Sequence, residues 1–278
     1  MDTLIHKYEI PSSQVEIRST LVTPVVEVLN KNFQCQDTFA YLADCQTYSI
    51  IVYDLKRDTS WKVSDKTMYP HPDYGTYTIQ GESFELMDGI LGMSLSPASD
   101  APLRKLFFHA MSSPAEHWVY THHLRNQSLF TDSTPPEIFT TLKGRRRTQA
   151  PAEAMDSNGI IYFGLVSDVQ IACFNTRLGD YGSYTSSDVI ADNPVTLQFA
   201  SGVKVIRNKK GEEELWILTS RFQKVASGTL NQNEINFRIQ AAKVNDLIYG
   251  TQCSPGHTVS VYLPQFLQTG GYGHYFTL

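Results

Sequence analysis

The chain has 278 residues, of which 41% are hydrophobic, 12% aromatic and 18% charged. That much apolar side chain fills a large folded core and excludes general disorder. The 23 basic and 28 acidic residues give a net charge of −5, which excludes the concentrated positive surface that duplex nucleic acid requires.

Apolar runs rich in Val, Ile, Thr, Tyr and Phe recur along the chain, and Gly and Pro interrupt them at short intervals. This composition and punctuation favour strands. Windows that could form helices break at Pro or alternate with period two, so the sequence predicts an all-β fold without a convincing helix. In chain order, we expect strands at residues 21–29, 39–44, 49–55, 60–64, 90–96, 106–112, 117–124, 149–155, 161–167, 170–176, 202–207, 215–220 and 236–244.

The predicted strands repeat as a unit. Four segments share one form, an apolar run that ends in a small or polar turn, and each has a strand before it and after it: FAYLAD (39–44), LFFHAMS (106–112), IYFGLVS (161–167) and LWILTS (215–220). Small antiparallel sheets repeated in this way are typical of β-propeller blades, which bury their faces against their neighbours. A β-sandwich is the alternative, but it has no reason to restart one strand order four times.

Longer motifs then follow one another in a fixed order, namely CQDTFAYLADCQTYSIIVYDLKRDTSWKV, GESFELMDGILGMSLSP, LFFHAMSS, MDSNGIIYFGLV, IACFNT, LWILTSRF and NEINFRI. With these motifs, the chain resembles the yellow and major royal jelly protein family of arthropods from residue 4 to about residue 253. The resemblance implies a six-bladed β-propeller, of which this chain would carry about four blades. We expect a partial propeller over residues 1–253, with blades near 20–65, 83–135, 149–195 and 197–250, and a carboxy-terminal tail over 254–278.

The resemblance also implies a location. The first residues, MDTLIHK, lack the basic and then apolar layout of a signal peptide, and no apolar run approaches the length of a membrane span. We therefore expect no membrane insertion. Family members usually carry a signal peptide and further blades ahead of the segment with which this chain begins, so the resemblance implies a secreted protein whose amino-terminal part is missing here.

The four cysteines, Cys35, Cys45, Cys173 and Cys253, show neither a CxxC motif nor the spacing of a zinc finger, so we expect no structural metal site. They are buried thiols or disulfides. The resemblance implies a disulfide between Cys35 and Cys173 and leaves the partners of the other two open. One glycosylation sequon begins at Asn126 in a polar segment, and it predicts a glycan if the protein is secreted.

Histidines and a basic run are the other candidates for chemistry. His109, His117, His122 and His123 invite a catalytic or metal-binding interpretation. Adjacent histidines on one strand point to opposite faces, so the last two cannot bind one ion, and surface or blade-packing roles are favoured. The run 145–147, three arginines, is expected to be a solvated loop rather than a phosphate site. No Walker loop, dinucleotide fingerprint, GxSxG or HExxH motif occurs, so we expect no cofactor and no metal ion.

A ligand site is expected where the first strand of each blade starts, because the second strands end and the third strands start on the same face. The residues at these positions are Asp44, Tyr48, Glu82, Ser83, Phe84, Asp88, Ser112, Gln149, Glu153, Ser167, Phe199, Thr219, Ser220, Asn236 and Phe237. Aromatic rings with a few hydroxyl, amide and carboxylate groups suit a small aromatic amine or catechol. The alternative is that the polar residues only form turns and the phenylalanines only pack between blades.

The resemblance supports the amine interpretation, because salivary members of the family bind serotonin and catecholamines in a central pocket. It implies Thr219, Asn236 and Phe237 as ligand-binding residues, and the predicted face adds Ser83 and Phe84.

Three functions remain open. The first is a secreted protein that binds a small aromatic amine or catechol in a pigmentation or cuticle setting. The second is a dopachrome-converting tautomerase of melanin formation, for which Glu82, Asp88, Glu153 or a histidine could be the base. Nothing in the sequence singles out one catalytic residue. The third is a nutritive or structural protein like those of royal jelly, which needs no site at all.

Overall fold

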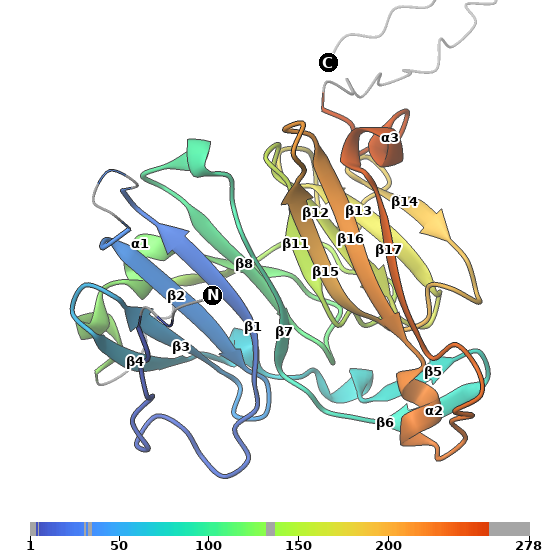
Figure 1. Ribbon diagram of the computed structural model, residues 1–278, viewed down its shortest axis with the longest axis horizontal. Coiled ribbons are helices and arrows are strands. Elements are labelled where there is room, and N and C mark those ends of the chain that lie inside the picture. The colour runs from blue at the N-terminus through green and yellow to red at the C-terminus, as the bar shows by residue number, and fades with distance from the viewer. Residues whose placement is uncertain (1–3, 5, 31, 33–34, 132–136, 256–278) are drawn as a thin grey trace, which may run out of the picture.

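The computed structural model describes residues 4, 6–30, 32, 35–131 and 137–255. It contains four small antiparallel sheets, each formed by strands that follow one another in sequence (Figure 1). Blade 1 comprises β1 (Leu21–Val28), β2 (Thr38–Asp44), β3 (Ser49–Asp54) and β4 (Thr59–Ser64). Blade 2 comprises β7 (Ile90–Leu95), β8 (Lys105–Ala110), β9 (His117–Tyr120) and β10 (Phe139–Thr141). Blade 3 comprises β11 (Glu153–Met155), β12 (Ile160–Leu165), β13 (Gln170–Asn175) and β14 (Ser187–Asp192), and blade 4 comprises β15 (Ala200–Arg207), β16 (Glu213–Ser220) and β17 (Phe237–Lys243).

The predicted all-β propeller with four blades in this chain is confirmed. The inner strands β1, β7, β11 and β15 lie beside one another in that order. A register shift recurs in three of them, between Val22 and Pro24, between Ile90 and Gly92, and between Ala200 and Gly202. Such a bulge bends a strand locally, so these blades repeat a backbone detail as well as a strand order.

The structure also contains elements that the sequence did not predict. A fifth sheet has two strands, β5 (Thr76–Ile79) and β6 (Glu82–Glu85), and is formed by the segment of the chain that connects blade 1 to blade 2. The expectation of no helix was wrong for three short segments of the described chain, α1 (Thr121–Leu124), α2 (Phe222–Ala226) and α3 (Val244–Ile248). Four or five residues are too few to show a helical period. The 3₁₀ turns are η2 (Lys66–Met68), η3 (Pro72–Tyr74), η4 (Ala98–Asp100) and η5 (Gln127–Phe130), and no helix among the described residues is long and apolar enough to span a membrane.

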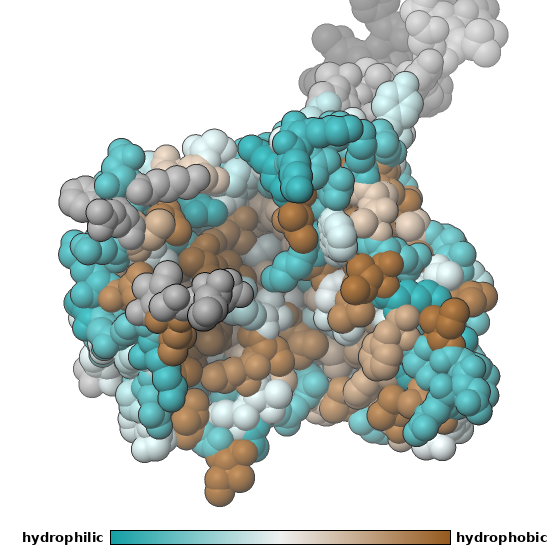
Figure 2. Space-filling model, in the orientation of Figure 1, coloured by the Kyte–Doolittle hydropathy of each residue, from teal (hydrophilic) through white to brown (hydrophobic). Residues whose placement is uncertain are grey.

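The core lies between the blades. Because each sheet stacks on its neighbours, central strands such as β3 and β12 are buried on both faces and consist of near-continuous apolar runs. Blade 4 differs, because side chains alternate between buried and exposed along much of β16, and those of β17 are half-buried or exposed. Trp216, Leu218 and Ile239 lie on its outward face and are 40%, 40% and 69% exposed, and Figure 2 shows hydrophobic side chains over these two strands.

The predicted disulfide between Cys35 and Cys173 was wrong. Cys173, on β13, is bonded to Cys253, which follows α3 and places its Cα 6.2 Å away. Cys35 is an exposed free thiol in blade 1, and blade 2 separates it from blade 3. Cys45 is a buried free thiol whose pKa is raised to about 12, chiefly by burial. The tail expected at 254–278 lies outside the described residues from residue 256 onward.

We expect Cys253→Ser to lower the free energy of unfolding by about 2–4 kcal/mol, because the disulfide closes a loop between residues 80 apart in sequence. Urea denaturation of the oxidised chain measures this loss. Cys35→Ser is the matched control and should leave the urea midpoint unchanged. Equal destabilisation by both variants would contradict the observed pairing.

Candidate functional site

The β5–β6 hairpin crosses the face on which the inner strands begin, and it contacts three blades. The hydroxyls of Tyr77 and Ser112 lie 2.7 Å apart, which joins the hairpin to blade 2. Gln149, ahead of blade 3, donates its Nε2 to the carbonyl groups of Tyr74 and Thr76 at 3.1 and 2.7 Å. On blade 4, α2 packs against β6 (Figure 1). The hairpin therefore spans blades 2, 3 and 4 on this face of the propeller.

Four aromatic side chains gather where the hairpin meets α2, and we call them the aromatic cluster. Tyr77 stacks on Phe84 with ring centroids 5.0 Å apart. Phe222 of α2 contacts Phe84 edge to face at 5.3 Å and stacks on Phe199 at 4.8 Å. Sequence reasoning had placed Phe84 and Phe199 on this face. It missed the other two members because it predicted neither the hairpin nor the helix.

The structure brings only some of the predicted ligand residues together. Phe84 belongs to the aromatic cluster, and Thr219 is buried at the end of β16, where its hydroxyl donates to the carbonyl of Thr196 at 2.8 Å. Ser83 is exposed, and its hydroxyl pairs within the hairpin. Phe237 is 68% exposed and makes no ring contact with another described residue, so it lies apart from the cluster.

Polar atoms without partners surround α2. The backbone N–H of Arg221 donates to the carbonyl of Asn236 at 3.2 Å, which fixes the start of β17 beside the helix. Gln223 donates its Nε2 to Gln198 Oε1 at 2.8 Å. The other side-chain atoms, Gln223 Oε1, Asn236 Oδ1 and Arg221 Nε, are buried and have no hydrogen-bond partner among the described residues. Buried acceptors are normally paired, so two oxygens here can accept a donor from water or a ligand.

Carboxylates of this face differ in their surroundings. Glu82 accepts hydrogen bonds from Lys224, at 2.6 Å, and from Thr229, and these bonds lower the pKa of Glu82. Burial raises the pKa of Asp88, although a hydrogen bond from Gln46 opposes the shift. Glu82 is therefore anionic near neutral pH, and Asp88 is the more basic carboxylate.

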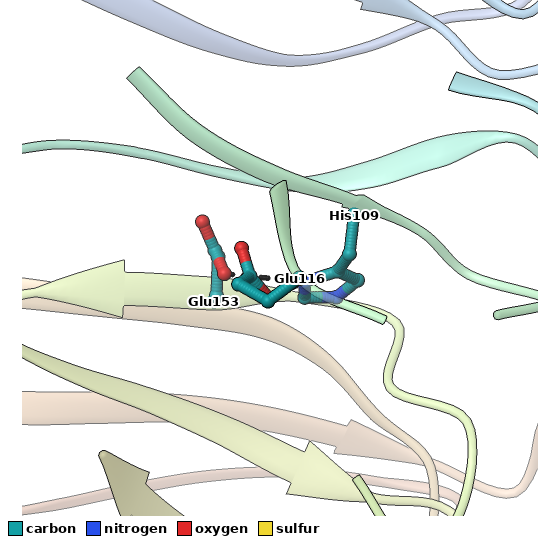
Figure 3. A group of neighbouring side chains, drawn as sticks. All are labelled: His109, Glu116 and Glu153. Atoms are coloured by element: carbon teal, nitrogen blue, oxygen red, sulfur yellow. Dashed lines mark hydrogen bonds and ion pairs between the residues drawn. The ribbon is translucent and has the colours of Figure 1, made fainter. Parts of the chain in front are cut away.

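Glu153, which was expected on the open face, instead belongs to a buried charged cluster between blades 2 and 3 (Figure 3). The Nδ1 atom of His109, on β8, lies 2.9 Å from Glu116 and 3.2 Å from Glu153. Its Nε2 atom lies 3.0 Å from the carbonyl of Ala150. Both ring nitrogens face oxygen acceptors, so both carry protons. The charge of Glu116 and the hydrogen bonds to both glutamates raise the pKa of His109, although burial, the largest effect, and Arg146 oppose this.

Arg146 completes the charged cluster. Its Nη1 atom donates to Glu116 at 3.0 Å and to Tyr181 at 2.8 Å, and Nη2 donates to the carbonyl of Ser113 at 2.6 Å. The expectation of a solvated loop at 145–147 was therefore wrong for Arg146, which is buried and pairs with the buried carboxylate of Glu116. His109 packs between blades, as favoured from the sequence.

His109, Glu116 and Glu153 bring ligand atoms within 4.8 Å of one another, as a metal site would. With His109 protonated, however, two positive and two negative side chains already balance. A divalent ion in place of the proton would leave an excess positive charge in a fully buried space, which is costly. The donor set therefore fits a proton better than a metal ion.

The other three histidines singled out from the sequence do not come together as a metal site in the part of the chain that the structure describes. His122 and His123 lie in α1 and not on a strand, so the expectation of opposite faces was wrong, and their ring centroids are 4.1 Å apart. Burial lowers the pKa of His117 to about 4, and its Nδ1 atom lies 2.9 Å from the hydroxyl of Thr141. His117 is therefore neutral and structural at neutral pH.

We expect Gly92→Ala to disrupt the charged cluster, because a Cβ atom at this position would lie 2.3 Å from the His109 ring. Displacing a buried imidazolium from its carboxylates should lower the free energy of unfolding by about 2–4 kcal/mol, measured by urea denaturation. Gly202→Ala is the matched control, because Gly202 follows the same register shift in blade 4 and its Cβ would lie 3.3 Å from the nearest atom. Equal losses in the two variants would argue against a special role for the imidazole position.

We expect the free energy of unfolding to decrease as the pH is lowered from about 6.5 to 4. Over this range His117 binds a proton in the unfolded chain, whereas its lowered pKa keeps it neutral in the folded chain. The contribution is on the order of 2–3 kcal/mol. His117→Asn keeps a hydrogen-bonding group near Thr141 but cannot titrate, so its unfolding free energy should fall less steeply across this range. His71→Asn, at a half-exposed histidine outside the core, serves as the control. If His117→Asn left the slope unchanged, this assignment would be ruled out.

Comparisons with known proteins agree with the architecture. The family model described as major royal jelly protein matches residues 1–253. Major royal jelly protein 9 of Apis mellifera is 34% identical over 90% of this chain and 59% of its own length. Dopaminechrome tautomerase of Drosophila melanogaster is 28% identical over 92% of this chain and 55% of its own, and protein yellow of Drosophila yakuba is 29% identical over 94% and 48%. The chain thus spans about half the length of these relatives.

Proposed function

The chain belongs to the major royal jelly protein family, and on that premise we propose that it binds a small aromatic amine or catechol where the β5–β6 hairpin meets α2. The unpartnered oxygens of Gln223 and Asn236 carry this proposal. An ammonium group or a catechol hydroxyl supplies the donors that these oxygens lack.

The surroundings suit the rest of such a ligand. The aromatic cluster provides ring faces and edges for stacking, with Phe84 only half-buried. Glu82 and Lys224 near α2 form an ion pair and cancel each other's charge, so the polar side of this face is set by the two unpartnered acceptor oxygens of Gln223 and Asn236. A cationic aromatic amine therefore matches both the apolar and the polar sides of this face better than an anion does.

The proposal includes the setting implied by the family, a secreted protein of pigmentation or cuticle. Asn126, the first residue of the sequon, is exposed, as glycosylation requires. Secretion would expose it to the glycosylation machinery, and a loss of mass on treatment with an amide-cleaving glycosidase would identify the glycan.

A tautomerase activity is the second candidate, because one relative is named dopaminechrome tautomerase. Its base would be Asp88, since Glu153 is sealed in the charged cluster and Asp88 has a raised pKa on the ligand-binding face. Faster loss of dopachrome absorbance than in a heat-treated sample, removed by Asp88→Asn, would support this activity. If dopachrome absorbance is lost no faster than in the heat-treated sample, the tautomerase activity is ruled out and only the binding function remains.

We expect Asn236→Ala and Gln223→Leu each to weaken dopamine binding by roughly 10- to 100-fold, the effect of losing one hydrogen bond to a charged group. Isothermal titration calorimetry with dopamine and serotonin measures the affinity, and circular dichroism verifies folding. Asn233→Ala, an exposed asparagine of the same loop, is the matched control. No binding heat from the folded chain would overturn the proposal and favour a nutritive or structural role.

A further inference from the structure

A cavity lies at the end of the propeller opposite α2, where β1 ends and β7 leads into η4. Its volume is about 390 Å³, and its lining combines apolar side chains with three charged ones: Glu27, Val28, Leu29, Ala98, Ala101, Pro102, Arg104 and Arg125. The inner strands run from the α2 face to this end. The cavity is therefore separate from the proposed amine site.

Glu27 anchors the charged side of this cavity. It is 1% exposed on β1, and the hydroxyl of Tyr41 donates to its Oε2 atom at 2.7 Å. From blade 2, Arg125 donates its Nη1 atom to Glu27 Oε2 at 2.8 Å, and Thr121 donates to Oε1 at 3.0 Å. The carboxylate thus has its hydrogen bonds satisfied and holds Arg125 in place across the junction of blades 1 and 2.

Arg104 lies on the same side. Its Nε and Nη2 atoms donate to the carbonyl of Ser96 at 3.0 and 2.7 Å, and its Nη1 atom stays 3.8 Å from Glu27. Neither Nη1 of Arg104 nor Nε and Nη2 of Arg125 forms a hydrogen bond within the described ranges of the chain. Two guanidinium groups against one carboxylate leave one positive charge in the cavity lining.

We propose that this cavity binds a small organic monocarboxylate. The carboxylate would accept hydrogen bonds from the free guanidinium nitrogens of Arg104 and Arg125, whose planar forks suit such an anion. The ligand body would lie against Val28, Ala101 and Pro102. A single excess charge neutralises a monoanion, and an apolar wall favours an organic body over inorganic phosphate or sulfate.

Benzoate is the probe, and benzyl alcohol is its neutral counterpart of similar shape. Isothermal titration calorimetry on the full chain should give saturable benzoate binding at least tenfold tighter than that of benzyl alcohol or sulfate. Arg125→Gln should weaken benzoate binding at least tenfold and leave dopamine binding unchanged. Tighter binding of sulfate than of benzoate would overturn the proposed ligand class.

Because Arg125→Gln also removes a partner of buried Glu27, a second variant is needed. Ala98→Phe places a ring at an exposed position of the cavity rim without altering any charge, and it should also abolish benzoate binding. Arg57→Gln, at a half-exposed arginine outside this lining, is the control and should bind benzoate as the unaltered chain does. Absence of saturable binding in the millimolar range, or equal affinity in Ala98→Phe, would overturn the site.

Discussion

Sheets can stack around an axis only when every charge buried between them is balanced, because an unpaired charge removed from water costs several kcal/mol. Two junctions of this propeller meet that condition with side chains from both blades. Glu27 of blade 1 is paired with Arg125 beside blade 2. At the next junction, Glu116 and Glu153 are balanced by His109 and Arg146.

These pairings specify which blades pack and in what register. A hydrophobic contact tolerates sliding, whereas His109 of blade 2 must meet Glu116 of its own blade, Glu153 of blade 3 and the carbonyl of Ala150 at once. The junction of blades 3 and 4 is instead largely apolar, and Tyr162 and Val203 lie in its core. The two candidate ligand sites lie at the ends of the inner strands, where this packing stops and polar groups are left without partners.

Much of the fold could be predicted from the sequence, because strands such as 39–44 and 215–220 repeat an apolar pattern that only stacked sheets bury. The short hairpin was missed, although Tyr77 and Ile79 alternate with exposed residues and Gly81 adopts the positive φ of a tight turn. Each strand of the hairpin has four residues, which is too short for the alternation to stand out in the sequence. Asn236 directly precedes β17, so it lies where the sequence predicts the start of the third strand of blade 4.

Other features depend on tertiary packing and have no local signal. His109 and Glu153 lie 44 residues apart, and nothing in their neighbourhoods reveals that a side chain of β8 reaches one of β11. Cys173 pairs with Cys253 and not with Cys35, because the segment after α3 returns to β13 while blade 2 separates the alternative partner. The contact of Arg125 with Glu27, which leaves two of its guanidinium nitrogens free, likewise depends on α1 lying beside β1 in the folded chain.

The central functional claim is that the unpartnered oxygens beside α2 receive a ligand donor, and a crystal structure of the protein with dopamine tests it most directly. We expect the dopamine nitrogen or a catechol hydroxyl at about 2.7–3.2 Å from Asn236 Oδ1 or Gln223 Oε1, with the ring against the aromatic cluster. Dopamine bound elsewhere, with both oxygens accepting hydrogen bonds from protein groups, would contradict it.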